Sequence, residues 1–248
     1  MDASIYARMA EIDNEHWWFA ARRRIVSALI EAQAPRRSGM RILEVGCGTG
    51  SNIALLQGYG TVDAVEPDDF ARAFASDRSG VAVKGGYLPD GVALDDGHYD
   101  FIVLLDVLEH IPGDLEALTA LRRKLAPGGR LMVTVPANPW MWSAHDAAHH
   151  HQRRYTAATL ADVFTRAGFR IRHRSHFNTL LFPLIVGVRA LHKLTGKTGG
   201  DDDAMPSPFV NRLLERVFGA ERHLVARGSL PFGVSLALVA EPDGVTTR

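Results

Sequence analysis

The chain reads Glu44-Val45-Gly46-Cys47-Gly48-Thr49-Gly50-Ser51 at the point where a short apolar segment, 41–45, runs into a cluster of glycines. This pattern predicts a strand that ends in a sharp turn, because glycine lacks a Cβ and lets a ligand approach the main chain. The next residues favour a helix over 51–58, whose first amides carry partial positive charge. We therefore expect a ligand at the end of this strand.

An acidic residue closes the next predicted strand, 61–66, which Pro67 terminates. This residue, Glu66, stands twenty positions after Gly46. A carboxylate placed there can accept hydrogen bonds from both hydroxyls of a ribose. The first half of the chain therefore predicts a site for an adenosine-containing ligand at the carboxyl ends of the strands.

Strand and helix signals alternate along most of the chain. Alternation of this kind predicts an α/β fold, Rossmann-like and doubly wound, with a mostly parallel sheet covered on both faces. The seven predicted strands are 41–45, 61–66, 81–84, 99–105, 130–135, 169–177 and 232–240, and the helices between them are 51–58, 68–76, 114–125 and 156–167.

One block breaks the alternation. Two apolar helical stretches, about 179–194 and 208–226, flank a polar linker at 199–208. We interpret this block as an insertion or lid within a single domain, 1–248. The parts of that domain are a helical cap at 1–38, a cofactor-binding core at 39–177, the insertion at 178–231 and the last strand at 232–240.

Composition limits the classes of function. The 248 residues suit one large domain, and 28 basic residues cancel 28 acidic ones, so bulk charge does not favour a nucleic-acid partner. The single cysteine, Cys47, excludes an intramolecular disulfide and a multi-cysteine zinc site. The first residues lack the order of a signal peptide, and no apolar run approaches the ~18 residues of a membrane span. We expect a cytoplasmic location.

The glycine loop also discriminates between ligands. The dinucleotide fingerprint G-x-G-x-x-G has its third glycine where this chain has Ser51. Glu44, two residues before the first glycine, would repel a pyrophosphate and favour a cationic ligand such as S-adenosylmethionine. Two alternatives stay open: Glu44 orders the loop by accepting its amides, or the protein is an NAD-dependent oxidoreductase.

Four segments together resemble the successive motifs of class I S-adenosylmethionine-dependent methyltransferases. They are Glu44 to Gly50, Glu66-Pro67, Asp106-Val-Leu-Glu-His110 and Pro127-Gly-Gly129, in the order and spacing of that family over about 40–136. The resemblance implies a seven-stranded sheet with an antiparallel last strand. It also implies S-adenosyl-L-methionine as cofactor and S-adenosyl-L-homocysteine as product.

The resemblance assigns roles by motif position. Glu66 would bind the ribose, and Asp106 would lie near the methionine amino group and the transferred methyl. The loop glycines Gly46, Gly48 and Gly50 would line the methionine part. Many relatives carry an acid after the third strand, whereas this chain has Gly85-Gly86-Tyr87-Leu88, so the adenine contact there would use main chain. The residues assigned to the cofactor are Glu44, Gly46, Cys47, Gly48, Gly50, Glu66, Pro67, Tyr87, Leu88, Asp106 and Val107.

The N-terminal segment His16-Trp17-Trp18-Phe19, followed by Arg22-Arg23-Arg24, resembles a bacterial subgroup close to the ubiquinone-biosynthesis O-methyltransferases of type 11/12. The resemblance implies a helix that closes over the cofactor, with Arg22 or Arg23 on the methionine carboxylate. Forked guanidinium donors suit a carboxylate. The alternative is a helix packed by its aromatic residues, with the arginines in solvent. We assign Trp17 and Trp18 to the acceptor site.

Histidines are the candidates for chemistry, because transfer to a hydroxyl requires removal of a proton near neutral pH. Among the eleven histidines, His110 follows the fourth predicted strand, and His145 and His151 follow the fifth. These three are our predicted catalytic residues. The segment from His145-Asp146 through His151 to Arg154-Tyr155 resembles an H-D-x-x-x-x-H-x-x-R-Y element of the same subgroup. We expect His149 and His150 to lie in an exposed loop without a role.

Aromatic and acidic neighbours complete the candidate site. Trp140 and Trp142 could form the wall of an acceptor pocket or pack in the core, and Arg154 and Tyr155 are further acceptor-site candidates. Two sets of residues have metal-binding chemistry, yet we predict no metal. These sets are Asp106, Glu109 and His110, and His145, Asp146 and His151.

The sequence thus predicts a methyltransferase that uses S-adenosylmethionine to methylate a small molecule, at a hydroxyl oxygen of an apolar or amphipathic metabolite. Alternatives are nitrogen or carbon acceptors, an NAD-dependent oxidoreductase and a non-catalytic cofactor-binding protein. Apolar helices with basic flanks across 179–226 suit a lid over the acceptor, a homodimer contact or a peripheral membrane contact. We predict no nucleic-acid partner.

Overall fold

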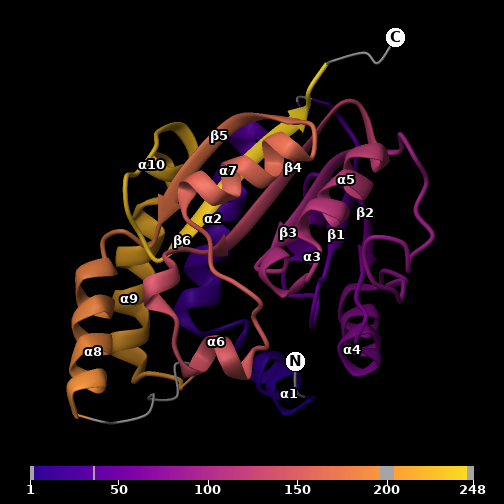
Figure 1. Cartoon of the computed structure of the whole chain (residues 1–248). Helices are drawn as coiled ribbons and strands as arrows, with labels where there is room; N and C mark the ends of the chain where they lie inside the picture. Colours follow the sequence, from indigo (N-terminus) through magenta and orange to yellow (C-terminus); the bar gives the residue numbers. More distant parts are fainter. Residues whose placement is uncertain (1–2, 36, 196–203, 245–248) are drawn as a thin grey trace.

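The computed structural model describes residues 3–35, 37–195 and 204–244. A six-stranded sheet in the order β2-β1-β3-β4-β6-β5 forms its centre (Figure 1). Strands β2, β1, β3 and β4 are parallel neighbours, whereas β6 is antiparallel to both β4 and β5. The predicted Rossmann-like fold with a reversed last strand is confirmed. The strands are β1 Met40–Val45, β2 Gly60–Val65, β3 Tyr99–Leu105, β4 Leu125–Pro136, β5 Phe169–Phe177 and β6 Ser235–Pro242.

The segment 81–84, predicted as the third of seven strands, adds only a single parallel bridge between Val65 and Lys84. The amide of Glu66 donates to the carbonyl of Lys84 at 2.9 Å, so this segment still touches the edge of the sheet. It forms no ladder, and the chain soon passes through Gly86 with φ of +140°. The sheet of the described residues therefore has six strands.

Helices cover both faces of the sheet (Figure 1). Apolar residues of α2 and α3 pack on one face, and those of α5 and α7 pack on the other. The helices are α1 Ala3–Ile12, α2 Trp17–Gln33, α3 Ile53–Gln57, α4 Asp69–Ser79, α5 Asp114–Lys124, α6 Ala144–Ala148, α7 Ala157–Arg166, α8 Phe182–Thr195, α9 Pro208–Ala220 and α10 Arg222–Arg227, with the 3₁₀ turns η1 Leu108–His110 and η2 Pro139–Met141.

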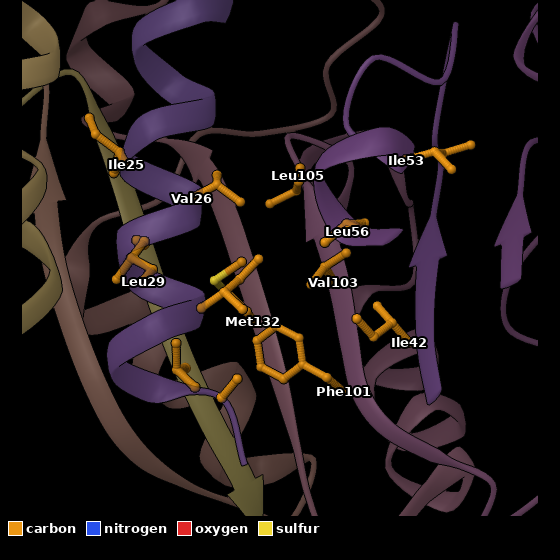
Figure 2. Close-up of a cluster of buried hydrophobic side chains, with 14 of the residues drawn as sticks. Ile25, Val26, Leu29, Ile42, Ile53, Leu56, Phe101, Val103, Leu105 and Met132 are labelled. Carbon is orange, nitrogen blue, oxygen red and sulfur yellow. The ribbon is translucent and has the colours of Figure 1, made fainter. Parts of the chain in front are cut away.

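The core between α2 and the sheet is shown in Figure 2. Ile25, Val26 and Leu29 of α2 belong to one buried cluster with Phe101 of β3 and Met132 of β4, and all five side chains are fully buried. Every residue of β3 is buried, as expected for a central strand covered on both faces. This packing fixes α2 against the sheet and thereby places its N-terminal turns beside the carboxyl ends of the strands.

The predicted N-terminal cap consists of two helices joined by a short turn. The side chain of His16 accepts a hydrogen bond from the amide of Trp18 at 3.4 Å and caps α2. In the turn, the fully buried carboxylate of Asp13 accepts from Arg78 of α4 at 2.7 Å and from the Thr49 hydroxyl at 2.8 Å. These bonds tie the cap to the glycine loop.

The insertion contains three helices in the described residues, because the predicted helix 208–226 is divided at Glu221 into α9 and α10. The buried carboxylate of Glu221 accepts from the amide of Leu180 at 2.7 Å, which links this junction to the start of α8. Residues 199–203 of the predicted polar linker lie outside the described residues. No helix among the residues described is both long and apolar enough to cross a membrane.

Candidate active site

A cavity of about 710 Å³ lies at the carboxyl ends of β1, β2 and β3. Segments from α1, α2, the glycine loop, η1, α6 and α8 line it, so the cap and the insertion both contribute walls. The predicted site residues that line the cavity are Trp17, Trp18, Arg22, Gly46, Cys47, Gly48, Glu66, Pro67, Tyr87, Leu88, Asp106, Val107, His110, His145, His151 and Arg154. Those that do not line it are Arg23, Glu44, Gly50, Trp140, Trp142 and Tyr155.

The three glycines of the loop all have positive φ but differ in their surroundings. A Cβ on Gly46 would lie 2.7 Å from a methyl of Val107, so the loop can pass the end of β3 only with glycine there. A Cβ on Gly48 would meet nothing within 4 Å, whereas one on Gly50 would lie 2.9 Å from the Cβ of Ala75 on α4. Gly50 therefore serves helix packing, and Gly46 and Gly48 form the cavity wall.

The carboxylate of Glu66 is held at the cavity by three donors. The amide of Gly48 donates to it at 2.8 Å, the amide of Asp68 at 3.0 Å and the hydroxyl of Tyr6 at 3.2 Å. Burial raises the pKa of Glu66, and the two amide bonds oppose that shift. Sequence reasoning missed Tyr6, because α1 carries no motif and only the tertiary packing brings it over β2.

Glu44 lies beneath the cavity rather than in its wall. Its carboxylate is almost fully buried and accepts from the side-chain amide of Asn52 at 3.2 Å. Burial raises the pKa of Glu44 to about 7. The expected electrostatic effect of Glu44 on a ligand in the cavity is therefore indirect, because Asn52, and not Glu44, reaches the cavity.

Arg22 and Asp106 form an ion pair in the cavity wall, with 2.5 Å between Nη2 and Oδ2. The same Nη2 donates to the hydroxyl of Thr134 at 3.2 Å, and the guanidinium lies 5.0 Å from the ring centroid of Trp18. Arg22 is only 5% exposed, which contradicts the alternative that places it in solvent. Arg23 points elsewhere and donates to the carbonyl of Asp13 at 2.6 Å, outside the cavity.

Four histidines gather on the other side of the cavity. The rings of His110 and His151 are 4.7 Å apart, and those of His145 and His149 are 4.0 Å apart. Burial, followed by the nearby His151 and His149, lowers the pKa of His110 to about 3. His149 is 9% exposed and lines the cavity, so the expectation of an exposed loop is wrong for this residue. His150 is exposed, although it also lines the cavity.

A buried acid lies behind His151. The carboxylate of Asp146 accepts from Nδ1 of His151 at 2.9 Å and from Nε of Arg154 at 2.7 Å, both at the same oxygen. Its other oxygen accepts from the amide of Ser143 at 2.8 Å. Burial alone would raise the pKa of Asp146, but the hydrogen bonds from His151 and Arg154 hold it below its ordinary range.

Of the aromatic residues assigned to the acceptor, Trp17 and Trp18 line the cavity, but Trp140, Trp142 and Tyr155 do not. Trp140 and Trp142 are 65% and 46% exposed and do not line the cavity. Tyr155 is buried in the core, where its hydroxyl donates to Asp114 at 2.8 Å. The apolar wall comes instead from the insertion, through Leu181, Leu184, Ile185, Val188 and Leu214. Helical periodicity signals that these residues share a face, but not that the face reaches the cavity.

Three groups in the described part of the chain are close enough to hold a metal ion together. Ligand atoms of Glu109, His110 and His151 lie within 4.8 Å of one another. Glu109 is fully buried, and among the described residues only its own backbone amide hydrogen-bonds to its carboxylate. Burial, followed by the charge of Asp106, raises the pKa of Glu109 well above the ordinary value. This set mixes members of the two sets considered from sequence, and the absence of a metal stays a prediction.

Comparisons with known proteins agree with the fold. A family model described as a methyltransferase domain matches residues 17–174. A protein of Mycolicibacterium smegmatis described as a probable S-adenosylmethionine-dependent methyltransferase is 27% identical over 161 residues, which are 63% of this chain and 61% of that protein. A ubiquinone biosynthesis O-methyltransferase of Aeromonas salmonicida is 27% identical over 157 residues, which are 55% of this chain and 66% of that one.

A solved structure is similar over almost the whole chain. It is a chain from the complex between the Haloferax volcanii Trm112 methyltransferase activator and a methyltransferase, with a TM-score of 0.64 at 16% identity, covering 99% of this chain and 97% of that one. At this identity the likeness establishes the fold alone. The chain spans about three fifths of the length of the first curated relatives that it matches. Because the family model covers well over half of the sequence, the chain belongs to the S-adenosylmethionine-dependent methyltransferases with a class I methyltransferase domain.

Proposed function

We propose that the chain acts as a single methyltransferase domain that transfers a methyl group from S-adenosylmethionine to a hydroxyl oxygen of a small apolar or amphipathic molecule. One observation carries this proposal. A single cavity has the glycine loop, Glu66 and the Arg22–Asp106 pair on one side and the histidine cluster on the other. Residues suited to the cofactor and candidate proton acceptors therefore line one cavity.

The residues on the first side suit the cofactor. A cavity of about 710 Å³ lies within the range of roughly 300–1,000 Å³ that small-ligand sites occupy. Glu66 offers carboxylate oxygens for a ribose diol, and the open backbone at Gly48 leaves room beside it. Arg22 and Asp106 offer opposite charges for the carboxylate and ammonium of a methionine, and no residue that the structure describes hydrogen-bonds to the buried Nε of Arg22. When bound, S-adenosylmethionine supplies a methyl group on a positively charged sulfonium.

The histidines on the second side support transfer to oxygen. The acceptor hydroxyl gives its proton to a histidine nitrogen, its oxygen forms a bond to the methyl carbon, and the carbon–sulfur bond breaks with its electron pair on sulfur. His110, His145 and His151 are the candidate bases, and all three line the cavity. The O-methylation named for the relative from Aeromonas salmonicida also favours oxygen over other acceptor atoms.

The insertion supports an apolar acceptor. Leu184 and Val188 of α8 line the cavity, yet they are 58% and 44% exposed, so the apolar wall continues onto the surface. Phe209 and Leu213 of α9 are exposed as well. We assign this surface to covering the acceptor, with a homodimer contact and a peripheral membrane contact as the alternatives. A lone, buried cysteine suits the reducing cytoplasm.

Transfer to an amine is the second candidate. Glu109 is a fully buried carboxyl group in the cavity wall, and no described residue other than Glu109 itself, through its backbone amide, hydrogen-bonds to its oxygens. An ammonium or amine of an acceptor would give those oxygens a partner beyond the backbone amide of Glu109 itself, and a buried acidic group with few partners is costly. This observation favours nitrogen acceptors over carbon acceptors as the alternative to oxygen.

Calorimetric titration with S-adenosylmethionine, S-adenosylhomocysteine and NAD tests the cofactor. We expect micromolar binding of the two sulfur ligands and no binding of NAD; tight NAD binding, or no binding of any of the three, would overturn the proposal. Incubation with methyl-labelled S-adenosylmethionine and matched panels of phenols, alcohols and amines then tests the acceptor. Label on the hydroxyl panel supports oxygen transfer, and label on the amine panel alone would replace it with nitrogen transfer.

A further inference from the structure

Asp146 is a buried carboxylate that does not line the cavity but contacts a residue that does. It lies on α6 with no exposed surface, and His151, which it binds, is part of the cavity wall. Four hydrogen bonds converge on it, from Nδ1 of His151, Nε of Arg154 and both the amide and the hydroxyl of Ser143. A carboxylate with this many donors has one fixed orientation.

That orientation decides which nitrogen of His151 carries the proton. An ionised carboxylate can only accept hydrogen bonds, so the Nδ1 at 2.9 Å from it must be the protonated nitrogen of the neutral ring. Nε2 is then left with a free lone pair. The guanidinium of Arg154 at 2.7 Å from the same oxygen keeps Asp146 ionised, since protonating this carboxylate would remove their attraction.

The other histidine close to His151 has a different partner. His110 forms its hydrogen bond with the backbone of His149, which is a neutral group. A carboxylate behind the ring, as at His151, stabilises the imidazolium that forms when the ring takes a proton. The two rings, 4.7 Å apart, are thus unequal in their suitability as bases.

We propose that Asp146 is a positioning residue that holds His151 with Nδ1 protonated and Nε2 as the proton acceptor for the methyl acceptor's hydroxyl. This inference rests on the proposed function, because it assigns the base for transfer to oxygen. The proton moves from the hydroxyl oxygen to Nε2 as the oxygen–methyl bond forms, and Nε2 later releases it to water. Asp146 remains ionised throughout and Arg154 fixes its orientation.

Long-range ¹H–¹⁵N correlation of the ¹⁵N-labelled full chain at pH 9 reads the protonation of each ring nitrogen directly. The His151→Gln variant identifies the His151 signals by their loss. We expect the wild-type ring to carry its proton on Nδ1 alone. A proton on Nε2, whether alone or together with one on Nδ1, would overturn the proposal. This measurement on the wild type needs no folded variant at Asp146.

Asp146→Ala supplies the second arm. It removes the acceptor of the Nδ1 proton, so we expect the proton of His151 to be shared between Nδ1 and Nε2 while the affinity for S-adenosylmethionine stays within about twofold. Ser143→Ala is the matched control, because it removes a donor from the other carboxylate oxygen and should leave the His151 proton on Nδ1. An unchanged His151 signal in a folded Asp146→Ala variant would overturn the positioning role.

Calorimetry separates the two proposals. If the wild type does not bind S-adenosylmethionine, the proposed function itself is overturned. If the wild type binds S-adenosylmethionine but its His151 ring bears the proton on Nε2, only the proposed role of Asp146 is overturned.

Discussion

The guanidinium of Arg22, on α2, lies 2.5 Å from the carboxylate of Asp106, directly after β3. The two side chains are 6% and 20% exposed, so each charge depends on the other for compensation. The pair joins the N-terminal cap to the central strand and places opposite charges side by side in the cavity wall. A zwitterionic ligand can therefore place its carboxylate against Arg22 and its ammonium against Asp106.

Arg22→Met should therefore damage both stability and cofactor binding. Removing one partner of a buried pair typically costs roughly 3–5 kcal/mol of unfolding free energy. Because Asp106 is partly exposed, we expect a loss of about 3 kcal/mol. Affinity for S-adenosylmethionine should fall by roughly 10-fold or more, as for a lost charge-assisted hydrogen bond. Urea unfolding and calorimetry measure the two effects.

Arg24→Met is the matched control for that change. Arg24 lies on the same helix, is 50% exposed and pairs with Glu215 outside the cavity, so its loss should cost less than about 1 kcal/mol and leave cofactor affinity unchanged. Equal effects of the two substitutions would contradict a special role for the Arg22–Asp106 pair.

Glu66→Ala should weaken binding of S-adenosylmethionine by about 1.5–3 kcal/mol, because charge-assisted hydrogen bonds to the ribose are lost. Calorimetric titration of the folded variant measures the change. The exposed carboxylate of Glu11 on α1 provides a control, since Glu11→Ala removes a charge far from the cavity wall. An unchanged affinity of folded Glu66→Ala for S-adenosylmethionine would contradict the assignment of Glu66 to the ribose.

The glycines of the loop should separate folding from binding. Gly50→Ala places a Cβ 2.9 Å from that of Ala75 at φ of +76°, and should destabilise the fold by about 2–4 kcal/mol. Gly48→Ala meets no atom within 4 Å and should cost only about 1–2 kcal/mol from its positive φ, while lowering cofactor affinity. Thermal unfolding of both variants beside calorimetry of Gly48→Ala checks this. Similar stabilities of Gly48→Ala and Gly50→Ala would contradict the close packing described at Gly50 and the open space described at Gly48.

Glu44 should give the protein a distinctive pH dependence. Burial raises its folded pKa to about 7 from an ordinary value of 4.5, so its contribution to stability is present below pH 4.5 and is lost as the pH rises through 7. Glu44→Gln should therefore gain stability relative to the wild type between pH 5 and about 7.5. Urea unfolding of both proteins at several pH values measures the difference. A constant difference would contradict the raised pKa.

The test compares the free energies of unfolding of Glu44→Gln and the wild type at each pH, because other groups of the wild type titrate in the same pH range. Burial lowers the pKa of His110 to about 3, so stability associated with this residue is gained as the pH rises from that value through the ordinary histidine range. This effect opposes that of Glu44 in the wild type. It cancels when Glu44→Gln is compared with the wild type at each pH.

Much of the fold and the cofactor half of the site could be predicted from the sequence. The loop from Gly46 to Gly50 and the acids Glu66 and Asp106 follow apolar strands directly, and the ends of parallel strands meet at one edge of a sheet. Local signals therefore place these residues together without any knowledge of side-chain packing. The short segment 81–84 was harder, because its pattern predicts a strand but cannot decide how many ladder bonds form.

The acceptor half could be predicted only in outline. The histidines were identified as a group, but the pairing of His151 with Asp146 and its approach to His110 depend on the path of the chain through α6. The sequence suited Trp140 equally to a cavity wall and to the core, whereas its side chain is exposed. Aromatic residues in a loop have no periodicity that fixes their direction, so packing alone decides it.

The sequence by itself determined the doubly wound fold, the glycine loop and the acid at the end of β2, since each depends on residues that are close along the chain. Only the tertiary structure decided that Arg22 rather than Arg23 enters the cavity, that Tyr6 binds Glu66 and that the insertion forms the apolar wall. The physical reason is that neighbouring helical residues differ by roughly 100° in direction. Which of those directions faces the cavity is set by burying the apolar face of α2 against the sheet.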